Sequence, residues 1–336
     1  MNQLSVKSFR ILILFLSLMI LNVFSCKKDD NPIKFPRGTF PDSTIILTGI
    51  NSQYDDYNMD LHQLLDYALI IFSSNRISTG EHFDLVQGVI SYFFNQTTGD
   101  FGVESEMTQN AFITKLISAA NTDGDDLGPY TLFSPADGYE YLLYSSQSAE
   151  GDLDFNYLRN QPVTGASQPA ILGPYPVKLL NTGSDDAYIS FDTNQDSVYF
   201  SSDTEGNFDI YIKTRPAETT ISEWFDGDYS ASQKADSINS SGNDKCPFVF
   251  RKYLVFASDR PGGFGGFDLY YSVFRKGKWS SPVNFGPDIN TTDNEYRPVL
   301  GSQEDFTNNF MIFSSDRPGG KGRFDLYMRG ITFPER

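Results

Sequence analysis

Short apolar runs alternate with polar turns along most of the chain, and the clearest example lies near the C-terminus. Residues 297–300, 310–313 and 324–328 are short runs rich in aliphatic and aromatic side chains, as expected of strands. Between the second and third runs lies Ser-Asp-Arg-Pro-Gly-Gly, in which Asp bonds its own backbone, Pro fixes φ and Gly accepts a positive φ. Residues 279–285 predict a fourth strand one unit earlier. This stretch therefore predicts a sheet of short strands.

Two signals of this stretch recur five times in the same order. The first is Asn followed by Ser or Thr and, four places on, a polar pair; the five asparagines are Asn51, Asn121, Asn181, Asn239 and Asn290. The second is a strand ending in Ser that leads into Phe-Asp or Phe-Asn, at Phe83, Phe155, Phe208, Phe267 and Phe324. Two independent signals repeated in one order indicate five structural units of four strands each.

The fold that this repeat predicts is an all-β, five-bladed β-propeller over residues 44–336. The chain ends soon after the third strand of the fifth unit, whereas residues 44–48 (Thr-Ile-Ile-Leu-Thr) form a strand without a unit of its own. We therefore expect this N-terminal strand to complete the fifth blade and close the ring. Apolar positions at helical spacing within residues 107–120 predict a short helical insertion after blade one, packed on the rim; a helix that binds a partner is the alternative.

Residues 1–25 are expected to be a signal peptide rather than part of the fold. Lys7 and Arg10 precede an apolar run from Ile11 to Phe24, which is short for a bilayer span. The run ends in Val-Phe-Ser-Cys, which resembles the lipobox of bacterial lipoproteins and implies lipidation of Cys26. An ordinary signal peptide that ends near Ser25 is the alternative.

Residues 26–43 are then expected to be a lipidated tether, because they hold three prolines and no periodic apolar pattern. The sequence Cys-Lys-Lys-Asp-Asp from Cys26 resembles the export tag of surface lipoproteins of Bacteroidota. It implies an outer-membrane protein, lipid-anchored and exposed at the cell surface.

The net charge and the small numbers of His and Cys limit the kinds of partner and metal site that the chain can have. The formal net charge is −17, which argues against nucleic acid as a partner and against adsorption of the whole domain to an anionic membrane. Two histidines, His62 and His82, leave little for a histidine-based zinc site. Cys246 is expected to be a lone buried thiol.

The second member of each polar pair is the main candidate for a site. These residues are Asp56, Asp126, Asp186, Asp244 and Glu295. In a propeller they enter the innermost strands, so we expect an acidic ring at one mouth of the central channel. A cation site or a sugar-binding mouth is one interpretation. The other is structural, with each carboxylate accepting backbone N–H groups, and repetition in every unit favours it. No metal ligand and no catalytic residue is singled out.

Two loops resemble the start of a calcium loop. Asp192 opens Asp-Thr-Asn-Gln-Asp-Ser, which lacks the central glycine and has Asp203 at its twelfth position, and the loop from Asn121 closes on Leu132. A hairpin turn is the favoured interpretation of the first, so no cofactor is predicted and a structural calcium ion remains the alternative. The arginines Arg76, Arg260 and Arg317 are expected to pair with turn or strand aspartates such as Asp259 and Asp268.

Phe-Ser-Ser-Asp-Arg, two glycines and Phe-Asp-Leu-Tyr together resemble the repeat of TolB-type, WD-repeat-like β-propellers, closely in blades four and five. Blade three lacks the proline after its acidic pair, and blade two has lost the Asp-Arg altogether. The resemblance implies a propeller and leaves activity open. We expect a non-catalytic binding or scaffold module for a protein or glycan partner. The alternative is a five-bladed carbohydrate-active hydrolase with carboxylates at the channel mouth, which should break the symmetry of the ring.

Overall fold

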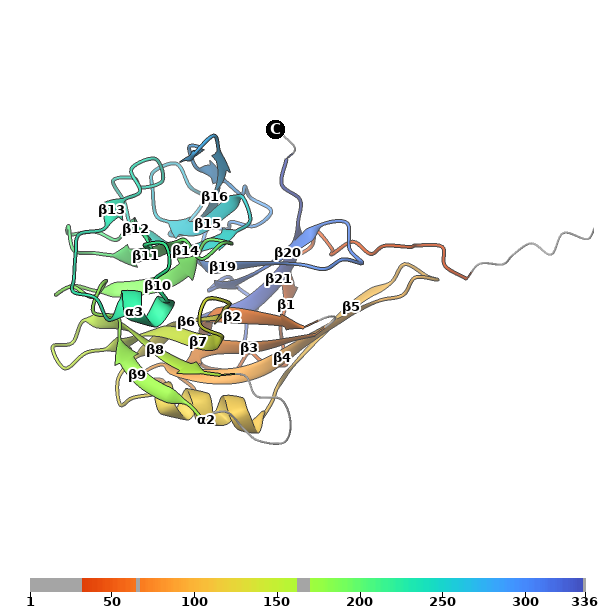
Figure 1. Ribbon diagram of the computed structural model, residues 1–336. Coiled ribbons are helices and arrows are strands. Elements are labelled where there is room, and N and C mark those ends of the chain that lie inside the picture. The colour runs from red at the N-terminus through yellow and green to blue at the C-terminus, as the bar shows by residue number, and fades with distance from the viewer. Residues whose placement is uncertain (1–31, 65–66, 162–169, 335–336) are drawn as a thin grey trace, which may run out of the picture.

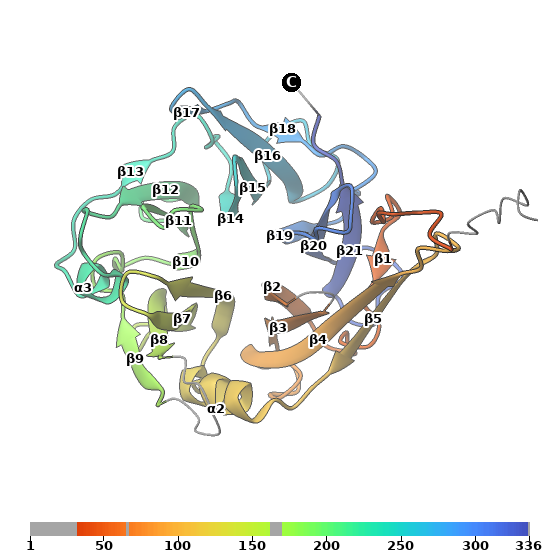
Figure 2. The ribbon, with the colours of Figure 1, turned by 45° about the vertical axis from the view of Figure 1, so that its right-hand side comes forward.

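The computed structural model describes residues 32–64, 67–161 and 170–334. Five antiparallel sheets stand around a central axis, which Figure 2 views nearly end-on. The predicted five-bladed propeller is confirmed. Within the described residues, no helix is long and apolar enough to cross a membrane.

The strands of each blade follow chain order from the axis outwards, except that the fifth blade takes its outer strand from the N-terminus. Four blades have four strands, and in blade 4 the outer strand is in two pieces. Blade 1 comprises β2 (Asp56–Leu64), β3 (Tyr67–Ser74), β4 (Asp84–Phe94) and β5 (Phe101–Met107). Blade 2 comprises β6 (Asp126–Ser134), β7 (Tyr139–Gln147), β8 (Leu153–Asn160) and β9 (Leu172–Pro176). Blade 3 comprises β10 (Asp186–Phe191), β11 (Ser197–Ser202), β12 (Asp209–Thr214) and β13 (Gln233–Lys234).

Blade 4 comprises β14 (Asp244–Phe250), β15 (Tyr253–Ser258), β16 (Asp268–Arg275) and two short outer pieces, β17 (Lys278–Trp279) and β18 (Val283–Asn284). Blade 5 comprises β19 (Glu295–Ser302), β20 (Asn309–Ser315), β21 (Asp325–Ile331) and β1 (Ile45–Ile46). The fourth strand predicted at 279–285 is therefore split. The turn between the second and third strands of every blade has a glycine with positive φ, at Gly80, Gly151, Gly206, Gly262 and Gly319.

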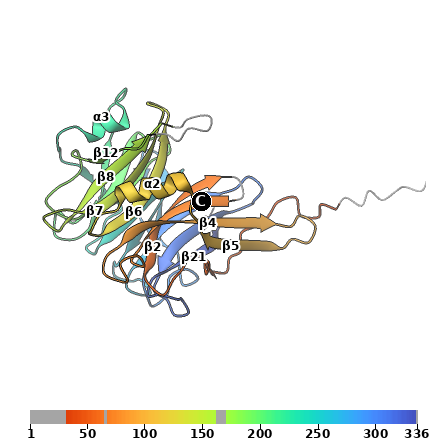
Figure 3. The ribbon, with the colours of Figure 1, turned by 90° about the horizontal axis from the view of Figure 1, so that it is seen from below.

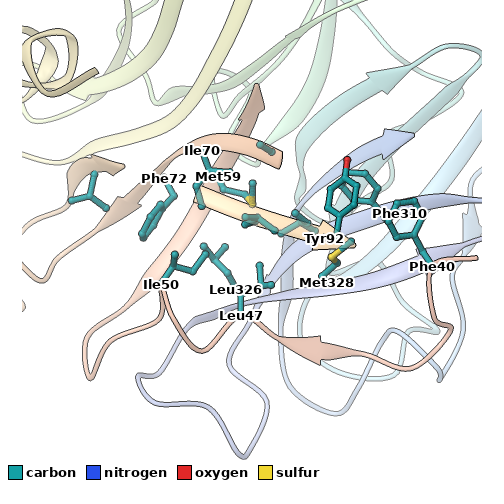
Figure 4. Packing of buried hydrophobic residues seen from close by; sticks show 14 of the residues in the cluster. Phe40, Leu47, Ile50, Met59, Ile70, Phe72, Tyr92, Phe310, Leu326 and Met328 are labelled. Atoms are coloured by element: carbon teal, nitrogen blue, oxygen red, sulfur yellow. The ribbon is translucent and has the colours of Figure 1, made fainter. Parts of the chain in front are cut away.

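The N-terminal strand closes the ring as predicted. Ile45 pairs with Met328 and Ile46 with Tyr327, and the Leu47 amide donates to Leu326 O at 3.0 Å. Leu47 lies in a core shared by blades 1 and 5 (Figure 4). Closure thus joins the two ends of the chain by main-chain bonds and by apolar burial.

Residues 34–40, which the sequence suggested were part of a tether, pack against the domain. Gly38 N donates to Asp305 O at 2.7 Å, and the Arg37 side chain donates to the Glu304 and Phe306 carbonyls. Phe40 is fully buried and stacks on Phe306 with 3.9 Å between the ring centroids. The folded domain therefore begins before residue 44.

The repeated asparagine fastens each blade to the blade before it. Asn51 Nδ2 donates to Leu326 O, and its Oδ1 accepts from the Leu326 amide. The same two bonds join Asn121 to Leu85, Asn181 to Phe155, Asn239 to Ile210 and Asn290 to Leu269. A side-chain amide that imitates a strand backbone explains why this residue type recurs in every unit.

Two helices of the described residues lie outside the sheets. The predicted helical insertion is α2 (Ala111–Ala120), which packs across β4, β8 and β9 and so bridges blades 1 and 2 (Figure 1). It begins where the Asn110 side chain accepts from the amides of Phe112 and Ile113. The other helix, α3 (Ile221–Phe225), was not predicted; it is a one-turn helix with a capping box from Thr220 to Glu223.

Candidate functional site

The acidic ring residues are buried and are held by their own loops. Each carboxylate accepts the amide of the Ser or Thr four places earlier, at 2.5–2.8 Å. Serine hydroxyls from the second strand add a bond to Asp56, Asp126 and Glu295. Across the described residues, no group of three or more His, Cys, Asp or Glu side chains is placed to hold a metal ion. The ring geometry is that of five separate turns.

Three of the five ring carboxylates also bind an arginine. Arg76 pairs with Asp56, Arg260 with Asp244 and Arg317 with Glu295. The expected pairing of these arginines with turn or strand aspartates is therefore wrong. Each guanidinium also donates to a backbone carbonyl of the loop before the inner strand.

Blades 2 and 3 lack this arginine, and among the described residues their ring carboxylates Asp126 and Asp186 have no cationic partner. Burial raises the pKa of Asp126 and of Asp186 to about 6. Asp186 Oδ1 has no hydrogen-bond partner among the described residues. A buried carboxylate with no cation beside it favours its neutral form, which accounts for the raised pKa.

A β-bulge interrupts every innermost strand two residues after the ring carboxylate. Register shifts follow Tyr57, Leu127, Ala187, Lys245 and Tyr296. The next residue has positive φ in each blade, and the five are Asn58, Gly128, Tyr188, Cys246 and Arg297. Four of them carry buried side chains. The bulge thus turns one residue per blade inward, and these side chains fill the channel at this level.

Arg297 crosses the axis. Its Nη2 donates to Pro129 O of blade 2 at 3.0 Å, and its guanidinium lies 5.8 Å from the centre of the Tyr188 ring. The side chain is fully buried, and Nε and Nη1 have no partner among the described residues. A buried cation therefore stands close to the inner strands of blades 1 and 2.

Asp60 of β2 breaks the five-fold pattern. Four residues after the ring carboxylate, the other blades have Tyr130, Ser190, Phe248 and Val299. Asp60 is 4% exposed and accepts both the amide of Thr131, at 2.8 Å, and the Thr131 hydroxyl. Burial raises the pKa of Asp60, while the Thr131 bonds and the Arg297 charge oppose that shift. A buried carboxyl with a raised pKa is the kind of group that can act as a general acid.

Asp60 opens into a pocket of about 260 Å³ between blades 1 and 2. Glu140 of β7 lines the same pocket and is half-buried, and Asn160 Nδ2 donates to its Oε2 at 2.8 Å. Phe133, which is 49% exposed, lies at the pocket's edge. The pocket thus joins a buried carboxyl, a partly solvated carboxylate and an exposed aromatic ring.

Helix α2 and strand β4 form the other side of this pocket. Gln87 accepts the Asn110 amide at 3.0 Å and donates to Thr114 Oγ1 at 2.7 Å, which ties β4 to the start of α2. Phe112, Ile113 and Leu116 supply apolar walls. The helical insertion after blade one is therefore what encloses the pocket.

Asp60 and Glu140 approach β6 from its two sides, Asp60 from β2 and Glu140 from β7. Asp60 bonds Thr131, and Glu140 pairs with Phe133 two residues further along β6. Both side chains line the same pocket. Two carboxyl groups that face one pocket are what glycoside hydrolysis by acid and base requires.

Neither Asp60 nor Glu140 was among the residues predicted from sequence. The acids that stand out in the sequence are those that recur in every blade, and recurrence in every blade is typical of a residue that builds the scaffold. Aligning the five units on the ring carboxylate and looking for an unmatched acid would have found Asp60. Glu140 has no such signal, because it follows a hairpin whose length and sequence differ from blade to blade.

The calcium-like loop at Asp192 forms the hairpin between β10 and β11. Asp192 Oδ1 accepts the amides of Asp196 and Ser197 at 2.8 and 3.2 Å. Leu132, at the closing position of the second loop, lies instead in β6 beside the pocket.

No family model matches the chain, and no curated protein resembles it in sequence. Its structure resembles an endo-arabinase from Bacteroides thetaiotaomicron, with a TM-score of 0.53 and 11% identity over 88% of this chain and 99% of that one. It also resembles the catalytic domain of a family 62 α-L-arabinofuranosidase from Coprinopsis cinerea (TM-score 0.52, 12% identity, 87% and 97% covered). A thermostable family 43 glycoside hydrolase is similar to the same degree (TM-score 0.52, 12% identity, 87% and 94% covered).

These neighbours correct two expectations. The relationship to TolB-type propellers is wrong, because the similar solved structures are glycoside hydrolases of families 43 and 62. The expectation of a non-catalytic module that is not an enzyme is overturned by the same finding. At 11–12% identity the likeness establishes the five-bladed fold, so the reaction has to be argued from this chain's own residues.

Proposed function

We propose that the chain is a glycoside hydrolase whose catalytic residues are Asp60 and Glu140, in the pocket between blades 1 and 2. The observation that supports this most is Asp60, a buried carboxyl at a position where the other four blades have no acid. It replaces the notion of catalysis by the acidic ring, whose carboxylates are engaged by their own loops.

In this proposal Asp60 is the general acid and Glu140 the general base. Burial raises the pKa of Asp60 and so favours the protonated form, which can give its proton to the leaving-group oxygen as the glycosidic bond breaks. Glu140, held by Asn160 and partly solvated, takes a proton from the water that attacks the opposite face of the sugar. The exposed Phe133 ring offers an apolar face on which a sugar can stack.

Arabinose-containing glycans are the first substrates to try, because two of the similar structures are named for arabinan or arabinofuranoside cleavage. The test is hydrolysis of arabinan and of nitrophenyl α-L-arabinofuranoside, β-D-xyloside and β-D-galactoside. We expect Asp60→Asn and Glu140→Gln each to lower kcat at least about 100-fold. The exposed Glu150→Gln is the matched control and should keep parental activity.

The anomer released first, followed by NMR, tests the base role of Glu140 independently, because a base that activates water gives inversion. The proposal fails if the parent cleaves no glycoside in this panel. It also fails if Asp60→Asn, folded by circular dichroism, cleaves as fast as the parent.

A further inference from the structure

The hairpin formed by β4 and β5 projects beyond the propeller on the side of the N-terminal segment (Figures 1 and 3). The hairpin and the N-terminal segment are hydrogen-bonded to each other at the hairpin tip. The amides of Lys34 and Phe35 both donate to Gln96 O at 2.9 Å, and Gln96 Nε2 donates to Pro36 O at 3.4 Å. The chain therefore leaves the folded domain from the end of this hairpin.

Large apolar side chains are exposed at this end. Phe93 is 57% exposed, Ile33 is 46% exposed and Phe35 is 44% exposed. The ring of Phe35 lies over Gly99 in the hairpin turn. Exposed aromatic and aliphatic side chains on a projecting tip are suited to contact another apolar phase.

The local charge differs from that of the whole chain. Residues 27–37 and the hairpin tip 93–101 together contain four basic residues (Lys27, Lys28, Lys34, Arg37) and three acidic ones (Asp29, Asp30, Asp100), a net charge of 4 − 3 = +1, whereas the chain carries −17. The acidic domain is poorly suited to lie on an anionic bilayer, but this tip is suited to touch one.

The distance to the proposed anchor is short. Ile33 follows Cys26 by seven positions, which an extended chain spans in at most about 25 Å. A lipid on Cys26 would therefore keep the hairpin tip within about 25 Å of the bilayer, so that contact itself depends on the side chains of the tip.

We propose that the β4–β5 tip, with residues 33–35, docks on the phospholipid surface and sets the orientation of the propeller. Phe93, Phe35 and Ile33 enter the boundary between headgroups and acyl chains, and Lys34 meets lipid phosphate. Gly88 of β4 lines the pocket, seven residues from Asn95 at the tip, so the pocket stands about 23 Å from the bilayer along the strand.

The experiment uses the full-length protein with its own lipid, reconstituted in vesicles of phosphatidylethanolamine and phosphatidylglycerol. A bimane label at Thr97→Cys reports the tip, and one at Thr193→Cys in the β10–β11 turn is the control; Cys246 is buried and should not react. With nitroxide-labelled lipids we expect quenching several-fold stronger at position 97 than at 193. Replacing both Phe35 and Phe93 by Ser should abolish the difference, whereas replacing Phe264 and Phe274, exposed in blade 4, should leave it unchanged.

Equal quenching at the two positions overturns the inference, as does strong quenching at the tip that survives loss of Phe35 and Phe93. Incorporation of a labelled fatty acid is measured on the same samples. A protein that takes up no label also overturns the inference, because the anchor that brings the tip to the bilayer is then missing. None of these results depends on the proposed hydrolase activity.

Discussion

The pKa of a buried carboxylate depends on whether a cation lies beside it, and through that pKa the stability of the fold depends on pH. Asp244 in blade 4 is held by Arg260, whereas Asp186 in blade 3 has Thr204 at the position of that arginine. The backbone matches in the two blades, because the Thr204 amide donates to Ser202 Oγ just as the Arg260 amide donates to Ser258 Oγ. An arginine at 204 should therefore reach Asp186.

Thr204→Arg is expected to stabilise the protein by about 1–2 kcal/mol at pH 8. The folded-state pKa of Asp186 is about 6, above the ordinary 3.8, so its ionisation opposes folding progressively as pH rises through that interval. The gain should be small near pH 4, should grow up to about pH 6 and then stay constant. Urea unfolding across this range is the measurement, with Thr204→Gln as the uncharged control. A gain independent of pH would contradict the mechanism.

The Thr131 hydroxyl favours the ionised form of Asp60, because it donates to that carboxylate. Thr131→Val removes the donor at nearly constant volume, so the pKa of Asp60 should rise. If Asp60 is the general acid, the alkaline limb of kcat/KM moves to higher pH. Thr182→Val removes the corresponding hydroxyl from Asp186 and should leave the pH profile unchanged. A profile that does not move in Thr131→Val removes Asp60 from the acid role.

At the scale of the strand, the short closing strand depends on what flanks it. Two residue pairs join β1 to β21, and the fully buried Phe40 and nearly buried Leu47 flank them. A chain that begins at Gly49 loses these contacts together. We expect it to be at least about 4 kcal/mol less stable, mainly from the lost burial of Phe40 and Leu47.

Calorimetry of that truncated chain is the test, and Phe40→Ala separates the core from the strand. The single substitution should account for a large part of the loss. A truncated chain that melts with the parent would show that β1 and its flanks are dispensable for closure.

How far the sequence could predict the structure depends on whether a residue acts in every blade. Asn51 and Asp56 recur because each blade needs the same clamp and the same turn, and from them the blade number could be predicted. The closure and the helix after blade one were predicted from the unmatched strand at 44–48 and from the helical spacing within 107–120. The bulge was not predictable, because Asn58, Tyr188 and Arg297 share a backbone conformation but no side-chain chemistry. The pocket was missed for a related reason: Asp60 and Glu140 occur once each and come together only through the packing of blade 1 on blade 2.

At the scale of the whole molecule, lipidation at Cys26 is a proposal that rests on Val-Phe-Ser-Cys and the short apolar run before it. Cys26→Ala should abolish incorporation of labelled fatty acid and release the protein from the outer-membrane fraction. Unchanged labelling in this variant would contradict the anchor. Protease added to intact cells tests surface exposure, with a known surface protein as the positive control.

The pairing of β1 with β21 also governs the order of events during synthesis. Ile45 is among the first residues of the domain to be made, and its partner Met328 is among the last. The ring therefore cannot shut until nearly all of the chain has left the ribosome, and until then the open edge of β21 and the apolar side chains around Phe40 face solvent. Joining segments so far apart in sequence is slow. A chain exported as proposed above would stay unsealed for the whole passage, the interval in which holdase chaperones should bind it most strongly.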